Sequence, residues 1–121
     1  MALAALKAGL AFSNTKTALA HSISYEMTLR HGLPHGIACS FTLPLVLGLA
    51  WGRDEARDRV LKRVFGKDLD EAQAQLRNFL HSLDVKTEFA DYGVTQEEAR
   101  EMIEFALQGA RGRNFIGAHA A

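Results

Sequence analysis

Apolar residues recur at helical spacing along most of this chain, and no segment shows the period-two alternation of a half-buried strand. The pattern predicts an all-α protein, a single helical domain of about six helices around one core. The expected helices span residues 2–12, 16–30, 35–49 and 54–65, one that opens at Asp68 and continues to Leu83, and one that opens at Thr95 and continues to Leu107. The first is nearly all apolar and is expected to be buried. Residues 109–121 are rich in Gly and Arg and show no periodicity.

The expected helix 16–30 carries two stripes on roughly opposite sides, and Ser13, Asn14 and Thr15 supply a break and a cap before it. The first stripe is purely apolar and consists of Leu19, Ile23 and Met27. The second is small and polar and consists of Ala18, His21, Tyr25 and Thr28. A helix with these two faces is expected to pass beside a functional site.

A tight turn follows this helix. Gly32 is expected to end it, and Pro34 forces the preceding residue out of the helical region. The next helix, residues 35–49, is apolar nearly all round and is expected to be central, with a kink at Pro44. Later in the chain, Asp68 and Thr95 are expected to cap the two helices that they open.

Composition narrows the class of protein. The 121 residues suffice for one domain with its own core, and 48% are hydrophobic. The formal net charge is zero, which argues against a nucleic-acid or anionic membrane surface. No apolar run is long enough to span a bilayer, and Lys7 interrupts the N-terminal apolar segment that would otherwise resemble a leader. Because a single cysteine, Cys39, is typical of a reducing compartment, we expect a cytoplasmic protein.

Residues 21–36 hold three of the five histidines, two of which are candidate metal ligands. His21 would project from one helix, and His35 would lie in the first turn of the next, where the positive end of the helix keeps an imidazole neutral. The turn between the helices could bring the two rings together. Spacing alone does not distinguish this pair from two unrelated histidines. His31 is discounted because Pro34 breaks its helical relation to His35.

Four segments resemble a known family. They are Ala11-Phe12-Ser13-Asn14, Ala20-His21-Ser22-Ile23-Ser24-Tyr25, Gly32-Leu33-Pro34-His35-Gly36-Ile37-Ala38 and Leu43-Pro44. This pattern resembles the iron-containing (group III) alcohol dehydrogenases, and the match is specific over roughly residues 8–50. The resemblance implies an N-terminal α/β domain that binds NAD(P) and a helical C-terminal domain with one divalent metal, Fe²⁺ or sometimes Zn²⁺. It also implies that an Asp and three His hold the metal, with His21 and His35 as two of these ligands.

The chain departs from that family pattern. The family takes its Asp and first His from an Asp-x-x-x-His segment, and no histidine here has an Asp four residues before it. No strand is predicted, so the sequence also shows no Gly-rich dinucleotide-binding loop after a strand. We therefore expect residues 1–121 to be a helical metal-binding domain without its dinucleotide-binding domain, inactive by itself. Self-association or a complementing chain is expected to cover the apolar surface left open.

Two further features concern the substrate. Many family members place a His where Tyr25 stands, near nicotinamide and substrate, and Tyr25 here would either donate a hydrogen bond to substrate or pack. The run Thr15-Lys16-Thr17, followed by His-x-x-Ser-Tyr, resembles the branch of the family that reduces phosphonoacetaldehyde-like substrates. Lys16 and Thr17 at a helix N-terminus could form an anion pocket, to which Arg111 and Arg113 could add. The alternative interpretation is that the side chains of Lys16, Arg111 and Arg113 are simply solvated.

The resemblance thus implies part of an NAD(P)-dependent alcohol dehydrogenase or aldehyde reductase that acts on a small alcohol or aldehyde with a divalent metal as Lewis acid. Two alternatives remain open. One is a non-catalytic helical remnant or interaction module that retains the fold but not the activity. The other is a split enzyme that a separate chain completes.

Overall fold

The computed structural model describes residues 1–13, 15 and 17–118, and no strand occurs among them. In this part of the chain, eight α-helices and one 3₁₀-helix follow one another. They are α1 (Ala2–Ser13), α2 (Leu19–His31), α3 (His35–Ser40), α4 (Leu43–Ala50), α5 (Glu55–Phe65), α6 (Leu69–Ser82), η1 (Phe89–Tyr92), α7 (Gln96–Gln108) and α8 (Ala110–Arg113). The all-α prediction is confirmed. No helix in the described part of the chain is both long enough and apolar enough to cross a bilayer.

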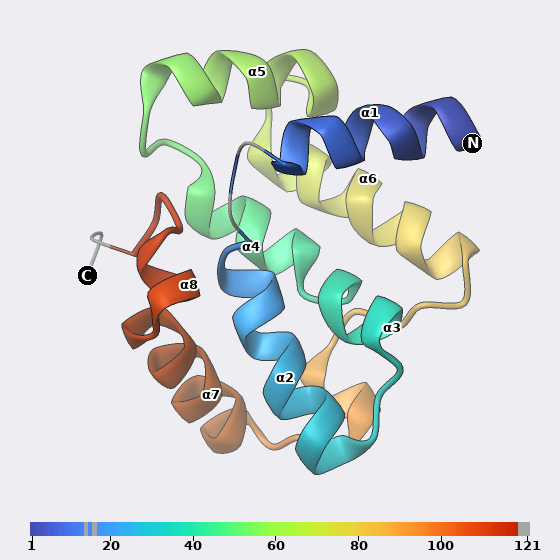
Figure 1. Ribbon diagram of the computed structural model, residues 1–121, viewed down its shortest axis with the longest axis vertical. Coiled ribbons are helices and arrows are strands. Elements are labelled where there is room, and N and C mark those ends of the chain that lie inside the picture. Colours follow the sequence, from blue (N-terminus) through green and yellow to red (C-terminus); the bar gives the residue numbers. More distant parts are fainter. Residues whose placement is uncertain (14, 16, 119–121) are drawn as a thin grey trace.

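The centre of the core is α2, which packs against α3, α7 and α8 (Figure 1). Its apolar stripe, Leu19, Ile23 and Met27, is fully buried, as the spacing predicts. Burying one such side chain stabilises the fold by roughly 1.5–3 kcal/mol. Because this stripe faces inward, the opposite side of α2, which carries His21 and Tyr25, is turned toward the surface.

The predicted helix 35–49 is two helices rather than one kinked helix. Pro44 lacks an N–H, and its ring would clash with the carbonyl of Ser40 in a continuous helix. The chain therefore ends α3 at Ser40 and starts α4 at Leu43, with Pro44 in the first turn. Phe41 lies at the break and is fully buried, where its ring meets those of Phe89 and Tyr92 edge to face at 5.1 and 5.0 Å between centroids.

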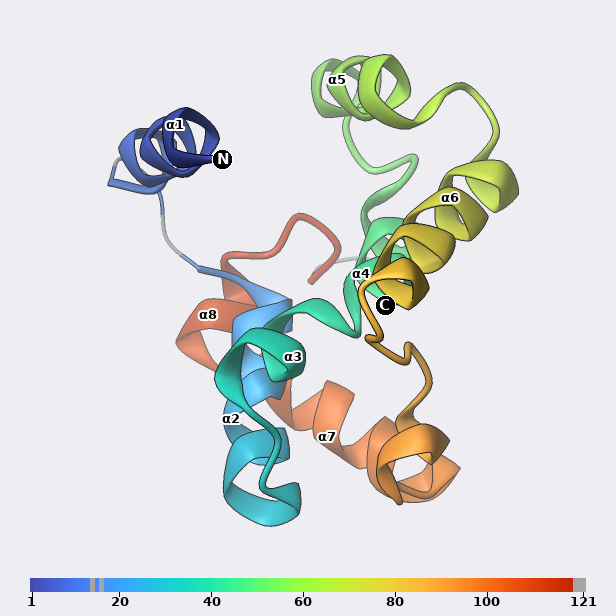
Figure 2. The ribbon, with the colours of Figure 1, turned by 90° about the vertical axis from the view of Figure 1, so that its right-hand side faces the viewer.

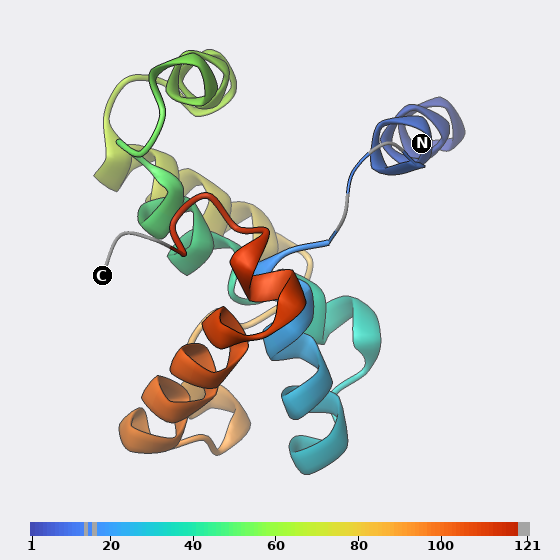
Figure 3. The ribbon, with the colours of Figure 1, turned by 60° about the vertical axis from the view of Figure 1, so that its left-hand side comes forward.

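The expectation that the first helix is buried is wrong. The helix forms, but it stands off from the remaining helices (Figures 2 and 3). Its leucines stay more than half exposed, with 64% for Leu3, 59% for Leu6 and 60% for Leu10. An apolar pattern indicates that a helix needs a partner surface, and the described residues do not supply one here.

The later helices form close to their predicted bounds, with differences in burial and at the ends. Asp54, Asp68 and Thr95 cap α5, α6 and α7, each accepting a hydrogen bond from a backbone N–H three residues later. In contrast, α5 buries no residue, and its apolar face is exposed. The cap expected before α2 is absent, since α2 begins at Leu19 without a side-chain cap. The short α8 lies in the segment that showed no periodicity.

Candidate metal centre

The turn between α2 and α3 is closed by local hydrogen bonds. Gly32 adopts a left-handed conformation at φ 66°, and its N–H donates to the carbonyl of Thr28 at 3.1 Å. The N–H of Leu33 donates to Met27 at 3.3 Å, and the Thr28 hydroxyl donates back to the Leu33 carbonyl at 3.0 Å. Pro34 is the N-cap residue of α3, which begins at His35. This C-terminal motif reverses the chain within a few residues and brings the two helices side by side.

The reversal places His21 and His35 next to each other. Their ring centroids are 5.4 Å apart, and the rings meet at an interplanar angle of 73°. His21 is half-buried and His35 is exposed, so that the pair lies at the surface of the α2–α3 junction. The structure therefore brings together the two histidines that the sequence proposes as metal ligands.

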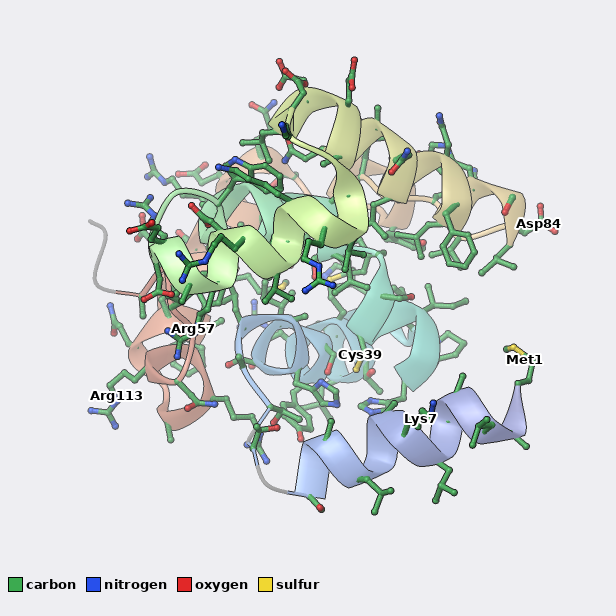
Figure 4. The ribbon with its side chains drawn as sticks, turned by 90° about the horizontal axis from the view of Figure 1, so that it is seen from above. Met1, Lys7, Cys39, Arg57, Asp84 and Arg113 are labelled. Atoms are coloured by element: carbon green, nitrogen blue, oxygen red, sulfur yellow. The ribbon has the colours of Figure 1, made fainter. Side chains whose placement is uncertain are left out.

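A third potential ligand, Cys39, joins the pair. Its Sγ lies 3.5 Å from Nε2 and 3.7 Å from Nδ1 of His35. One ligand atom from each of His21, His35 and Cys39 lies within 4.8 Å of the others. Figure 4 shows Cys39 between α2 and α3. Sequence reasoning overlooked it, although its position four residues after His35 on one helix places the two side chains on the same face.

The surroundings of His21 favour the neutral imidazole. Burial lowers the pKa of His21, and the neighbouring His35 and Arg111 lower it further. A neutral ring has a free lone pair, which a metal ion requires. The donor set of two imidazoles and a thiol therefore suits a transition metal, although two of the four ligands that the family resemblance implies are not in this chain.

A cationic side chain lies beside the pair. Arg111, in α8, donates from Nε to the Thr17 hydroxyl at 3.0 Å, and its Cζ stands 5.1 Å from the ring centroid of Tyr25. Tyr25 thus packs under a guanidinium one helical turn from His21. Thr17 and Tyr25 are brought together, whereas Lys16, the other predicted anion-binding residue, lies outside the described residues. Arg113 lies at the outer edge of the molecule (Figure 4).

The other histidines are engaged elsewhere or lie outside the description. His31 Nε2 donates to Glu98 Oε1 at 3.0 Å and links the end of α2 to α7. His81 is exposed and pairs with Thr87 at 3.1 Å. His119 lies outside the described residues. His31 is thus engaged in a contact that joins two helices.

A cleft of about 740 Å³ lies away from the histidine pair, between α4, α6, η1 and α7. Its lining includes Thr42, Gln73, Arg77 and Glu88. The hydroxyl of Thr42 is buried there and has no hydrogen-bond partner among the described residues. None of the predicted metal-binding or anion-binding residues lines this cleft, so it is separate from the histidine pair.

The geometry can be compared with known proteins. The sequence model described as "Fe-containing alcohol dehydrogenase family, C-terminal" matches residues 1–119, nearly the whole chain. The chain belongs to the iron-containing alcohol dehydrogenase family. The helical fold agrees with the C-terminal domain of that family. Membership implies, in general, a metal and a nicotinamide cofactor.

Two curated relatives are similar to this member of the family. A sulfoacetaldehyde reductase of Bilophila wadsworthia is 27% identical over 122 residues, which cover 92% of this chain and 32% of the relative. The NADPH-dependent aldehyde reductase YqhD of Escherichia coli is 37% identical over 86 residues, which cover 61% of this chain and 21% of YqhD. The chain thus spans about a third or less of the length of these relatives. No solved structure matches it.

Proposed function

We propose that this chain is the metal-binding helical part of an NAD(P)-dependent alcohol dehydrogenase or aldehyde reductase. The observation that carries the proposal is the juxtaposition of His21 and His35, 5.4 Å between ring centroids, in a chain of this family. A divalent ion, Fe²⁺ or Zn²⁺, supplies Lewis acidity toward a carbonyl or alcohol oxygen when bound. The α2–α3 turn holds the two imidazoles in place, and burial of His21 keeps its lone pair free.

The remaining parts of the reaction centre are proposed to come from polypeptide outside these 121 residues. These 121 residues contain no Asp-x-x-x-His segment, and no strand occurs among the described residues. Two imidazoles by themselves bind a metal weakly and leave its geometry undefined. A longer gene product or a separate chain would supply an Asp, a further His and the nicotinamide. This assignment fits an enzyme of the cytoplasm, a compartment in which NAD(P) is available.

The substrate that the surroundings favour is a small aldehyde with an anionic group, such as a sulfonate or a phosphonate. Arg111 places a guanidinium against Tyr25 and Thr17, close enough to His21 to lower its pKa. A guanidinium forms paired, charge-assisted hydrogen bonds with such anions. The sulfoacetaldehyde reductase among the relatives supports this substrate class.

A chimeric enzyme tests the proposed function. The C-terminal segment of YqhD that aligns with this chain would be replaced by the chain, so that YqhD supplies the nucleotide domain and the missing ligands. We expect NADPH oxidation with sulfoacetaldehyde and phosphonoacetaldehyde. The matched control is the same chimera with His21→Ala and His35→Ala, which should be inactive. A folded chimera that binds NADPH but reduces no aldehyde would overturn the proposal.

The same chimera tests the substrate class. Arg111→Met should raise KM for the anionic aldehydes by roughly 10- to 100-fold, because a hydrogen bond to a charged group contributes roughly 1.5–3 kcal/mol. KM for propionaldehyde, which has no charge, should stay unchanged. Equal changes for charged and uncharged aldehydes would show that Arg111 supports the fold and does not select an anion.

The exposed apolar surface favours a second candidate, an interaction module without catalysis. Leu3, Leu6 and Leu10 of α1 and Val60 and Val64 of α5 are all at least 59% exposed. Such surface is expected to be covered by another copy or another chain. An inactive chimera together with a concentration-dependent dimer in sedimentation would favour this candidate over the enzyme.

A further inference from the structure

The cluster at the α2–α3 junction contains one more donor than the histidine pair. Among the described residues, ligand atoms of His21, His35 and Cys39 all lie within 4.8 Å of one another. The histidines come from two helices, and Cys39 follows His35 by one helical turn in α3. Cys39 is partly exposed and is not in a disulfide, so a metal ion can reach its sulfur.

The distances fit a common metal ion. In a tetrahedral zinc site with Zn–N of about 2.0 Å and Zn–S of about 2.3 Å, a nitrogen and a sulfur ligand lie about 3.5 Å apart. The observed distance from Cys39 Sγ to His35 Nε2 is 3.5 Å. The remaining separations, up to 4.8 Å, need to shorten by up to about 1.5 Å, since two nitrogen ligands of one zinc ion lie about 3.3 Å apart.

Rotation of these side chains can supply that adjustment. The sulfur of Cys39 is nearly equidistant from the two ring nitrogens of His35, at 3.5 and 3.7 Å. Neither nitrogen lone pair therefore points toward a place where one metal ion could contact both the nitrogen and the sulfur. His35 is exposed, and the terminal torsion of a histidine has a broad energy well. Turning this ring therefore requires no movement of the helices.

We propose that Cys39 is a third metal ligand, so that this chain by itself holds a soft divalent cation such as Zn²⁺ with His21, His35 and Cys39. The proposal extends the proposed function, on which it rests for the role of the two histidines. On binding, the thiol proton passes to solvent and the sulfur–metal bond forms, with no change of oxidation state. Thiolate ligands select soft ions. Three protein ligands leave a fourth tetrahedral position open for water or for a ligand from the polypeptide that completes the reaction centre.

Cobalt spectroscopy tests the proposal on the purified chain. Co²⁺ replaces Zn²⁺ in such sites and gives a thiolate-to-cobalt charge-transfer band in the near ultraviolet only when sulfur is a ligand. The chain would be titrated with Co²⁺ under a phosphine reductant, followed by displacement with Zn²⁺. We expect the band in the wild type, its loss in Cys39→Ser, and an affinity at least roughly 100-fold lower in that variant, since even outer-shell partners contribute 10- to 100-fold.

Controls separate this outcome from others. His81→Ala, on the distant α6, should retain both the band and the affinity, whereas His21→Ala should weaken binding. If the wild type binds Co²⁺ without the band and Cys39→Ser binds Co²⁺ equally well, Cys39 is not a ligand. Cys39 then only packs against His35, and the metal is bound by the two histidines without it. If the wild type binds no Co²⁺, the three-ligand site is refuted. The chimera would still decide the proposed function, because YqhD supplies further ligands there.

Discussion

Phe41 offers a sharp test of how the α2–α3 junction is held. Its side chain is fully buried at the break between α3 and α4, and it contacts Phe89 and Tyr92 edge to face. It thereby fixes the end of the helix that carries His35. Phe41→Ala removes a large side chain and leaves a cavity. The neighbouring residues belong to other elements and can fill this cavity only in part. We expect the free energy of unfolding to fall by about 4 kcal/mol.

That value converts into a large thermal shift. At about 2.1 cal/mol/K per residue, a chain of 121 residues has an unfolding entropy of about 0.25 kcal/mol/K, so that 1 kcal/mol moves Tm by about 4 °C. Phe41→Ala should therefore lower Tm by about 16 °C in circular dichroism or calorimetry. Phe41→Leu, which preserves most of the volume, should lower it by less than half as much.

Phe105→Ala provides the matched control. The Phe105 side chain is 68% exposed, so the same chemical change removes little burial and should alter stability by less than about 0.5 kcal/mol. Equal Tm values for Phe41→Ala and Phe105→Ala would refute the placement of Phe41 in the core, and with it the anchoring of α3.

Two further predictions concern packing and pH. Gly112→Ala should lower stability by about 1–3 kcal/mol in urea unfolding, because a Cβ there would overlap the carbonyl oxygen of Ala106. In the control Gly9→Ala the Cβ would have no described atom within 4 Å, so this change should be neutral or stabilising. Burial raises the pKa of Tyr92, whose hydroxyl donates to the Lys86 carbonyl at 2.6 Å. The folded state therefore keeps this proton longer than the unfolded state, and stability should fall as pH rises above about 10. Tyr92→Phe should flatten that alkaline decline, and an equally steep decline in the variant would contradict the assignment.

The sequence predicted those parts of the fold that local chemistry controls. The spacing of Leu19, Ile23 and Met27 identified the buried face of α2, and Asp68 and Thr95 marked where helices begin. Gly32 marked the end of α2. Each of these features depends on residues within one or two helical turns, so a single sequence contains the information.

Other features depend on what lies across space. The leucines of α1 satisfy a buried pattern, yet burial requires a partner that the pattern cannot identify. Pro44 indicated a disturbance, but whether the helix bends or breaks depends on the pocket that receives Phe41. The hydrogen bond between Arg111 in α8 and Thr17 joins residues that are 94 positions apart. No local periodicity of the sequence indicates such a contact.

The candidate site shows the same division. The motif around His21 and His35 was recognisable because its residues are specific, and the structure brings the two rings together. Cys39 was overlooked because a lone cysteine in an apolar run is usually inert. Its proximity to His35 follows from helical spacing, but its proximity to His21 depends on how α2 and α3 pack.

The most direct test of the central claim, that these 121 residues by themselves hold a divalent metal at His21 and His35, is Tm measured against zinc concentration. Once zinc exceeds its dissociation constant, each tenfold increase should add about 1.4 kcal/mol, or about 5 °C, and a chelator should remove the effect. The variant with both His21→Ala and His35→Ala should give a flat line. A wild-type Tm that stays constant into the millimolar range, or a double variant that responds equally, would contradict the claim.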